Sequence, residues 1–142
     1  DFFFNLSNKK SGTTVAILGQ TENANYAKDL TYNTSSNTLR WCNNVSGTTN
    51  FAIVSNTTMA KDNWYHVALV HTGSTQYMFI NGTKQTTTGS YTGGYTYTSD
   101  FQIGAETITS YNNFNGNLQD FRITKKALWT SNFTPPRRSG AF

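Results

Sequence analysis

The stretch NWYHVALVHTGSTQYMFINGTK, residues 63–84, decides the fold class of this 142-residue chain. Between residues 64 and 70 both alternating sets of positions are apolar, one being Trp64, Ala68 and Val70 and the other Tyr65, Val67 and Leu69. Because alternate residues of a strand point to opposite faces, this run predicts a strand covered on both sides, in the middle of a sheet. The Asn81-Gly82 pair that follows predicts a hairpin with a type I′ turn, since both residues tolerate positive φ. We expect His66, inside the same run, to be a core histidine.

The rest of the chain also consists of short apolar runs divided by turn residues, the pattern of a sandwich or barrel. The remaining predicted strands are Phe2–Leu6, Thr14–Leu18, Tyr26–Tyr32, Thr38–Cys42, Phe51–Ser55, Thr83–Thr88, Phe101–Gly104 and Leu118–Thr124, beside Trp64–His71 and Gln76–Ile80 in the opening stretch. No window with helical periodicity is long enough for a helix, although Lys125–Trp129 suits one turn. The sequence therefore predicts an all-β protein.

The composition narrows the class of function. Charged residues are only 13% of the chain, against roughly 25% in an average globular protein, and neutral Thr, Asn, Ser and Gly replace them. Such a surface is common in secreted adhesins and virus fibres. The net charge of +4 comes mainly from lysine and arginine doublets, without a basic stripe interleaved with aromatics, so we expect no nucleic-acid partner. No apolar run approaches the ~20 residues of a membrane span, which argues against a membrane partner.

Several motifs in order resemble one family. The opening stretch is followed by FQIG (101–104) and then by FNGNLQDFRITKKALWTSNFTPP (114–136). This series resembles the laminin-G-like, concanavalin A-like lectin/glucanase superfamily, and more narrowly the version carried by phage and other viral virion proteins. The positions that match its pattern are Trp64, His66, Val67, Ala68, Asn81, Gly82, Ile103, Gly104, Phe114, Gly116, Leu118, Asp120, Phe121, Arg122, Ile123, Ala127, Leu128, Trp129, Asn132, Phe133, Pro135 and Pro136.

The resemblance implies an antiparallel β-sandwich of the jelly-roll type over residues 1–136, followed by a basic tail at 137–142. The family normally has one more strand ahead of the segment that Asp1–Leu6 resembles. Either upstream residues were left out, or another chain supplies that strand. Because an uncovered sheet edge is a template for pairing, we expect Asp1–Leu6 to pair with one of these two.

The stretch 114–136 closes the predicted fold. Leu118, Phe121 and Ile123 do not share one period of two, which predicts a bulge or twist near Gln119-Asp120. We expect Trp129 and Phe133 to cap an open end of the sandwich after the helical turn. Pro135-Pro136 continues neither a helix nor a central strand, so the chain is extended there.

Carboxylates are too scattered for the hydrolytic chemistry of the glucanase branch, which needs two of them about 5–9.5 Å apart. No two acidic residues lie within three positions of each other, so we predict no enzymatic activity. Calcium prefers six to eight oxygen ligands, and the isolated aspartates favour no metal site or cofactor. Among these aspartates, Asp120 is the best candidate for a calcium ligand. The single Cys42 forms no internal disulfide and is expected to be an apolar filler.

Two tyrosine-rich segments carry the candidate binding residues. Aromatic rings stack on sugars, and amides bond to their hydroxyl groups. The candidates are Tyr91, Tyr95, Tyr97, Tyr111, Asn112 and Asn113. They form one patch if their two segments meet, and that patch contacts either a carbohydrate or a neighbouring subunit.

The first functional hypothesis is a non-enzymatic virion module, structural or adhesive, in a capsid decoration, tail or fibre. Its partners are other virion subunits or the upstream part of the same chain, together with host-surface glycans. The alternative is a carbohydrate-recognition lectin domain of a secreted or cell-surface protein. Both place the chain on a virion surface or outside cells.

Overall fold

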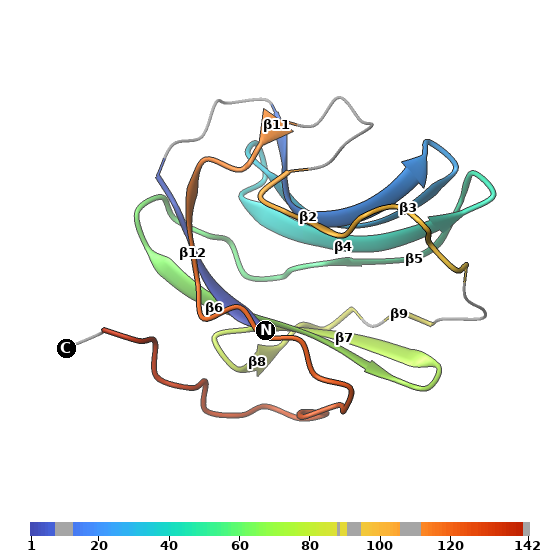
Figure 1. The fold of residues 1–142 in the computed structure, drawn as a ribbon. Helices are drawn as coiled ribbons and strands as arrows, with labels where there is room; N and C mark the ends of the chain where they lie inside the picture. The colour runs from blue at the N-terminus through green and yellow to red at the C-terminus, as the bar shows by residue number, and fades with distance from the viewer. Residues whose placement is uncertain (8–12, 88, 91–94, 106–111, 141–142) are drawn as a thin grey trace.

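The computed structural model describes residues 1–142 except 8–12, 88, 91–94, 106–111 and 141–142 (Figure 1). Its described part contains strands and no helix. The strands are β1 (Phe2–Leu6), β2 (Thr14–Asn23), β3 (Tyr26–Asn33), β4 (Thr38–Val45), β5 (Thr48–Val54), β6 (Trp64–Thr72), β7 (Thr75–Ile80), β8 (Thr83–Lys84), β9 (Gly89–Ser90), β10 (Gln102–Ile103), β11 (Asn112–Asn113) and β12 (Gly116–Gln119). No helix of the described chain is long and apolar enough to cross a membrane.

The strands form two facing sheets, as an all-β sandwich requires (Figure 1). The β6 sheet has the order β12-β1-β6-β7-β8, with β9 also paired to β7. The β3 sheet has the order β10-β2-β3-β4-β5, with β11 also paired to β2. Among the described strands, pairing is antiparallel except between β11 and β2. The predicted fold class is confirmed.

The opening stretch folds as its pattern predicts. β6 lies between β1 and β7, with apolar residues on both faces. Val67 faces the main core between the sheets, whereas Ala68 and Val70 belong to a second cluster on the outer face. Asn81 and Gly82 have φ values of 49° and 76°, so the predicted type I′ turn is confirmed.

Strand β1 (Phe2–Leu6) is paired on both edges within this chain. β1 pairs with β6 on one side (Phe2↔Val67) and with β12 on the other (Phe3↔Gln119). The prediction that these residues pair with an upstream segment or another chain is wrong, because β12 returns from the distant end of the sequence to the edge of β1. Gly116 permits this close approach, since a Cβ there would overlap the carbonyl oxygen of Asn5.

The predicted irregularity near Gln119-Asp120 is a one-residue bulge. Phe3 is paired with Gln119, yet the next backbone exchange joins Asp1 to Arg122, with N···O distances of 2.8 and 2.9 Å. Two steps along β1 therefore face three steps along the other strand, and Asp120 takes up the extra residue with a φ of 54°.

The segment after the bulge, residues 121–136, is here called the strap. The helical turn predicted at Lys125–Trp129 is wrong: residues 125 and 126 are bends, and the strap is extended. Trp129 and Phe133 do not cap an end of the sandwich either. They pack on the outer face of β6 and β7, against Ala68, Val70 and Phe79. The reason is visible in the spacing, because alternate residues of an extended chain, such as 127 and 129, turn the same way.

The strap is fixed at the β7–β8 turn. The backbone N–H of Phe133 donates to the carbonyl of Gly82 at 3.0 Å, and the Lys84 N–H donates to the Asn132 side chain at 2.8 Å. A Cβ at Gly82 would overlap the Phe133 carbonyl oxygen. Figure 1 shows the strap running along the β6 sheet on the side away from the β3 sheet.

Candidate functional site

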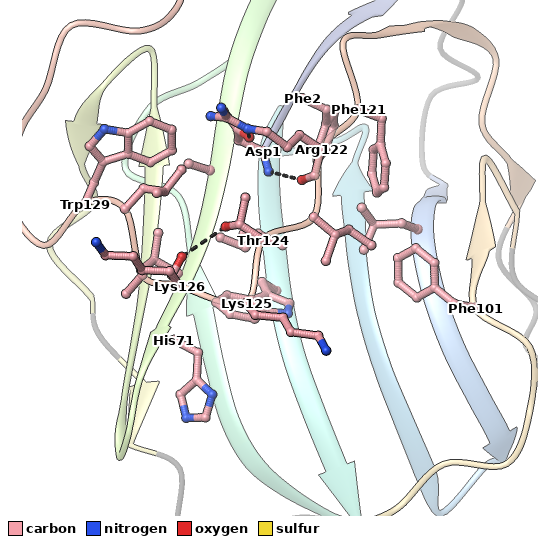
Figure 2. Close-up of a pocket in the computed structure, with 18 of the residues that line it drawn as sticks. Asp1, Phe2, His71, Phe101, Phe121, Arg122, Thr124, Lys125, Lys126 and Trp129 are labelled. Carbon is pink, nitrogen blue, oxygen red and sulfur yellow. Dashed lines mark hydrogen bonds and ion pairs between the residues drawn. The ribbon is translucent and has the colours of Figure 1, made fainter.

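A cleft of about 520 Å³ opens at one flank of the sandwich (Figure 2). It exists because β1 begins opposite Val67 while β6 continues to Thr72, so β1 leaves the edge of β6 uncovered from Ala68 onward. The strap crosses in front of this gap, and the β3 sheet forms the opposite wall. We call this space the flank cleft; its size is in the range of about 300–1,000 Å³ typical of small-molecule sites.

The β3-sheet wall places a lysine where apolar residues are expected. Leu30 and Tyr32 on β3 face the main core, and Lys28 lies on the same face by alternation. Lys28 and Gln20 both line the cleft, and they are register partners on β3 and β2. Burial holds the pKa of Lys28 below its ordinary value. Its side chain makes no hydrogen bond or ion pair with any residue that the structure describes.

Aromatic rings form a second part of the cleft lining. The Phe121 ring lies between Phe2 and Phe101, with centroid separations of 5.7 and 6.3 Å. Phe101 is 44% exposed, whereas Trp41, which also lines the cleft, is buried. The row of rings thus runs from the core out to the solvent and offers apolar ring surface to a ligand in the cleft (Figure 2).

The strap supplies the mouth of the cleft with cations and exposed apolar groups. Lys125 and Lys126 are exposed, and Figure 2 shows their side chains leaving the strap in different directions. The Thr124 hydroxyl donates to the Lys126 carbonyl at 3.0 Å, and this bond stabilises the bend of the chain at residues 125 and 126. Ile123 and Leu128 are 73% and 41% exposed at the same rim.

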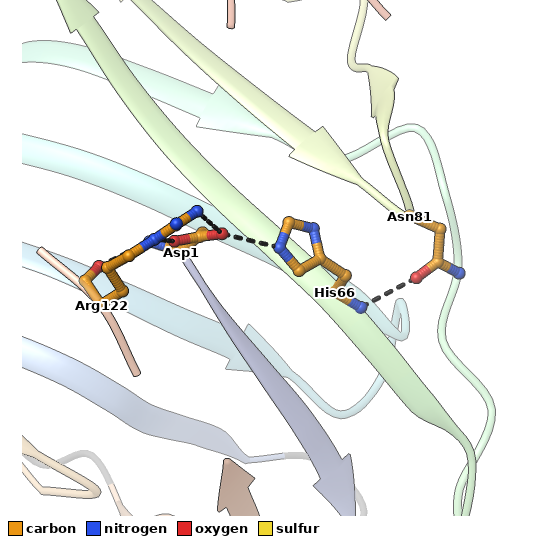
Figure 3. Close-up of polar contacts among 4 residues, drawn as sticks. All are labelled: Asp1, His66, Asn81 and Arg122. Carbon is orange, nitrogen blue, oxygen red and sulfur yellow. Dashed lines mark hydrogen bonds and ion pairs between the residues drawn. The ribbon is translucent and has the colours of Figure 1, made fainter. Parts of the chain in front are cut away.

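A polar cluster anchors the strap beside the cleft (Figure 3). The Arg122 guanidinium binds both carboxylate oxygens of Asp1, at 2.9 and 3.0 Å. The same carboxylate lies 3.0 Å from Nε2 of His66, and the His66 backbone N–H donates to Asn81 Oδ1 at 2.8 Å. The only carboxylate that lines the described part of the cleft is therefore already neutralised by its neighbours.

His66 is a core histidine, as predicted, with 1% of its surface exposed. The rings of Phe3, Trp129 and Phe133 surround its imidazole at centroid separations of 4.9, 6.1 and 5.8 Å. Burial, followed by the positive charges of the chain's first amine and Arg122, lowers the pKa of His66 to about 4. The imidazole is therefore neutral near pH 7 and serves as a packing and hydrogen-bonding group.

The predicted tyrosines are placed elsewhere and are engaged with the protein. The Tyr95 ring stacks on Tyr26 at 4.2 Å and meets the edge of Tyr97 at 5.1 Å. The Tyr97 hydroxyl donates to Asn43 Oδ1 at 2.6 Å. Both rings are half-buried near the β2–β3 hairpin. Tyr91 and Tyr111 lie outside the described residues.

The predicted amides and the predicted metal residue are also apart from the cleft. β11 pairs Asn113 with Ala16, near the opposite end of β2 from the tyrosines, so Asn113 does not join them in one patch. The strand pairing of Asn112 is described, but its side chain is not. Asp120 is exposed and accepts a hydrogen bond from the Ser139 N–H at 2.8 Å, and this bond lowers its pKa. In the described chain, no three His, Cys, Asp or Glu residues gather as a metal site would require.

Sequence reasoning missed the residues that line the cleft, above all Lys28 and Phe101. A signal for Lys28 was present, because a lysine that shares a strand face with a leucine and a tyrosine is unusual. No comparable signal marked Phe101, since its role depends on Phe121 arriving from the bulge at Asp120.

Comparison with known proteins agrees with the sandwich fold. A family model described as the concanavalin A-like lectin/glucanases superfamily matches residues 1–132. The chain belongs to this superfamily. No curated protein and no solved structure matched it. Members of the concanavalin A-like superfamily are typically binding modules, and the laminin-G-like model covers both sheets and the strap as far as Asn132.

Proposed function

We infer that this concanavalin A-like domain is a non-enzymatic, lectin-like binding module that takes a carbohydrate in the flank cleft. The observation that carries the proposal is the cleft lining itself, in which the Phe121 and Phe101 rings lie together with the polar side chains of Gln20 and Lys28. Flat rings for stacking and a few polar groups for orientation are what saccharide binding needs. No cofactor is required by such binding.

The setting we propose is the surface of a virion, in a capsid decoration, tail or fibre, where the module contacts other subunits and host glycans. The order of the motifs from the W-Y-H-V-A run to the double proline supports this setting through its resemblance to virion proteins. A lectin domain of a secreted or cell-surface protein is the alternative. Mass spectrometry of purified virus particles distinguishes the two, because only the first requires the chain to be a particle component.

A glycan array tests carbohydrate binding with two matched variants. Phe101→Ala removes a cleft ring that is 44% exposed, whereas Ile103→Ala removes a neighbouring apolar side chain that is 48% exposed and does not line the cleft. We expect Phe101→Ala to lose at least ten-fold in affinity for any bound glycan, with a nearly unchanged melting temperature. Ile103→Ala should bind as the parent does. Absence of binding to any glycan, or equal binding by both variants, would contradict the proposal.

A further inference from the structure

The charges that line the flank cleft are unbalanced. Four cationic side chains, Lys28, Arg122, Lys125 and Lys126, line it together with one carboxylate, that of Asp1. Arg122 and Asp1 satisfy each other through two hydrogen bonds, so this pair contributes no free charge. The three lysines make no side-chain ion pair with the described residues, and the cleft therefore carries an uncompensated positive charge.

Lys28 is the most informative of these cations because it projects from the middle of a strand. It stands in register with Gln20 on β2 and Asn43 on β4, and Leu30 follows on the same face. A half-buried ammonium group among such neighbours loses hydration without gaining a counter-ion, and burial accordingly lowers its pKa. An anion bound in the cleft would supply the missing counter-ion. The hydrogen bonds from Lys28 to it would be charge-assisted, and such bonds are about twice as strong as neutral ones.

Cationic side chains lie on two sides of the cleft. Lys28 lies on the β3-sheet wall, and Lys125 lies at the mouth on the strap, so anionic groups can be held from both sides. The Phe121 and Phe101 rings lie in the same lining and present an apolar face to the ring of a sugar (Figure 2). A neutral sugar would use the rings but leave the lysines without partners.

We propose that the ligand of the flank cleft is an acidic saccharide, whose carboxylate or sulfate group binds Lys28 while its sugar ring stacks on Phe101 and Phe121. This inference rests on the proposed carbohydrate binding and specifies its ligand class. Lys28 acts as the specificity-determining residue, and Lys125 assists it at the mouth.

Calorimetric titration of the whole domain tests the inference with four probes. These are a uronic-acid tetrasaccharide, the same tetrasaccharide with its carboxyl groups reduced to alcohols, a sulfated tetrasaccharide and a tetraglutamate peptide. We expect at least one acidic sugar to bind ten-fold or more tightly than the reduced sugar and the peptide. Whichever acidic sugar binds better identifies the anionic group.

Two matched variants locate the effect. Lys28→Met should reduce acidic-sugar binding at least ten-fold, whereas Lys61→Met, which removes the same charge from an exposed lysine paired with Asp62, should change it less than two-fold. The melting temperature of Lys28→Met should equal or exceed that of the parent, because a poorly hydrated charge is removed. A fall in both stability and binding would mean that Lys28 is structural, and would overturn its role.

The outcomes separate this inference from the function on which it rests. Equal binding of the reduced and acidic sugars refutes the acidic class but leaves carbohydrate binding standing. Binding of tetraglutamate as tight as that of the acidic sugars refutes the sugar class, because the cleft would then recognise charge alone. Failure of every sugar to bind refutes both proposals.

Discussion

Replacing Gly82 with alanine tests how the strap is held against the β6 sheet. Gly82 has a φ of 76°, and a Cβ there would overlap the carbonyl oxygen of Phe133. The backbone conformation alone costs an alanine about 1–2 kcal/mol. Displacing Phe133 also disrupts its stacking on Trp129, where the ring centroids are 4.0 Å apart, and its contact with Phe79 at 5.3 Å. Losing this half-buried aromatic packing costs roughly 2 kcal/mol more.

The matched control is Gly73→Ala in the β6–β7 turn. Gly73 has a φ of 60°, and nothing lies within 4 Å of the position of its added Cβ. Denaturant unfolding followed by circular dichroism should show a loss of about 3–4 kcal/mol for Gly82→Ala and about 1–2 kcal/mol for Gly73→Ala. Because the strap also forms a wall of the flank cleft, only Gly82→Ala should weaken ligand binding. Equal losses of stability in the two variants would refute the docking of the strap on this turn.

Three further changes probe other parts of the structure. Trp129→Ala should destabilise the domain by about 2–3 kcal/mol, as expected for a half-buried indole on the outer face of a sheet, and an unchanged melting curve would show that the indole contributes nothing there. Tyr97→Phe should cost about 1–2 kcal/mol, because it leaves the buried Asn43 amide oxygen without its 2.6 Å donor; no loss by thermal denaturation would place the hydroxyl in solvent. The pKa of His66 falls from 6.5 to about 4 on folding, so between these values the unfolded chain binds a proton that the folded chain does not. Stability present above pH 6.5 should therefore decline by up to about 3 kcal/mol as the pH falls to 4; His66→Phe should remove this share of the pH dependence, and an identical profile in the variant would contradict the assignment.

The sandwich was predictable because local sequence patterns determine its central strands and their turn. The doubly apolar run at Trp64–Val70 requires cover on both faces, and Asn81-Gly82 admits one tight turn. The bulge was predictable for the same reason, since the apolar residues on either side of Asp120 change phase. In each case the signal is local, so neighbouring residues in the sequence contain it.

What could not be predicted depends on contacts between distant segments. The outer partner of β1 is β12, which lies more than a hundred residues away in the sequence. The close approach of the two strands at Gly116 is seen only in the folded structure. The strap lies flat because the outer face of β6 offers Ala68 and Val70 to Trp129, which no property of residues 125–129 alone indicates. The flank cleft lies beside the start of β1, between the strap packed on β6 and the β3 sheet, so its residues come from both sheets and the strap.

Nuclear magnetic resonance mapping of the uronic-acid tetrasaccharide on the domain tests the central claim, that the flank cleft is the binding site. Backbone amide shifts report contacts residue by residue, so the cleft and the tyrosine-rich segments are read in one titration. We predict that the shifts concentrate at Gln20 and Lys28, at Leu69 on β6 and along residues 121–126, while Tyr95 and Tyr97 stay unchanged. Shifts confined to the two tyrosines and their neighbours, or no shifts at all, would contradict it.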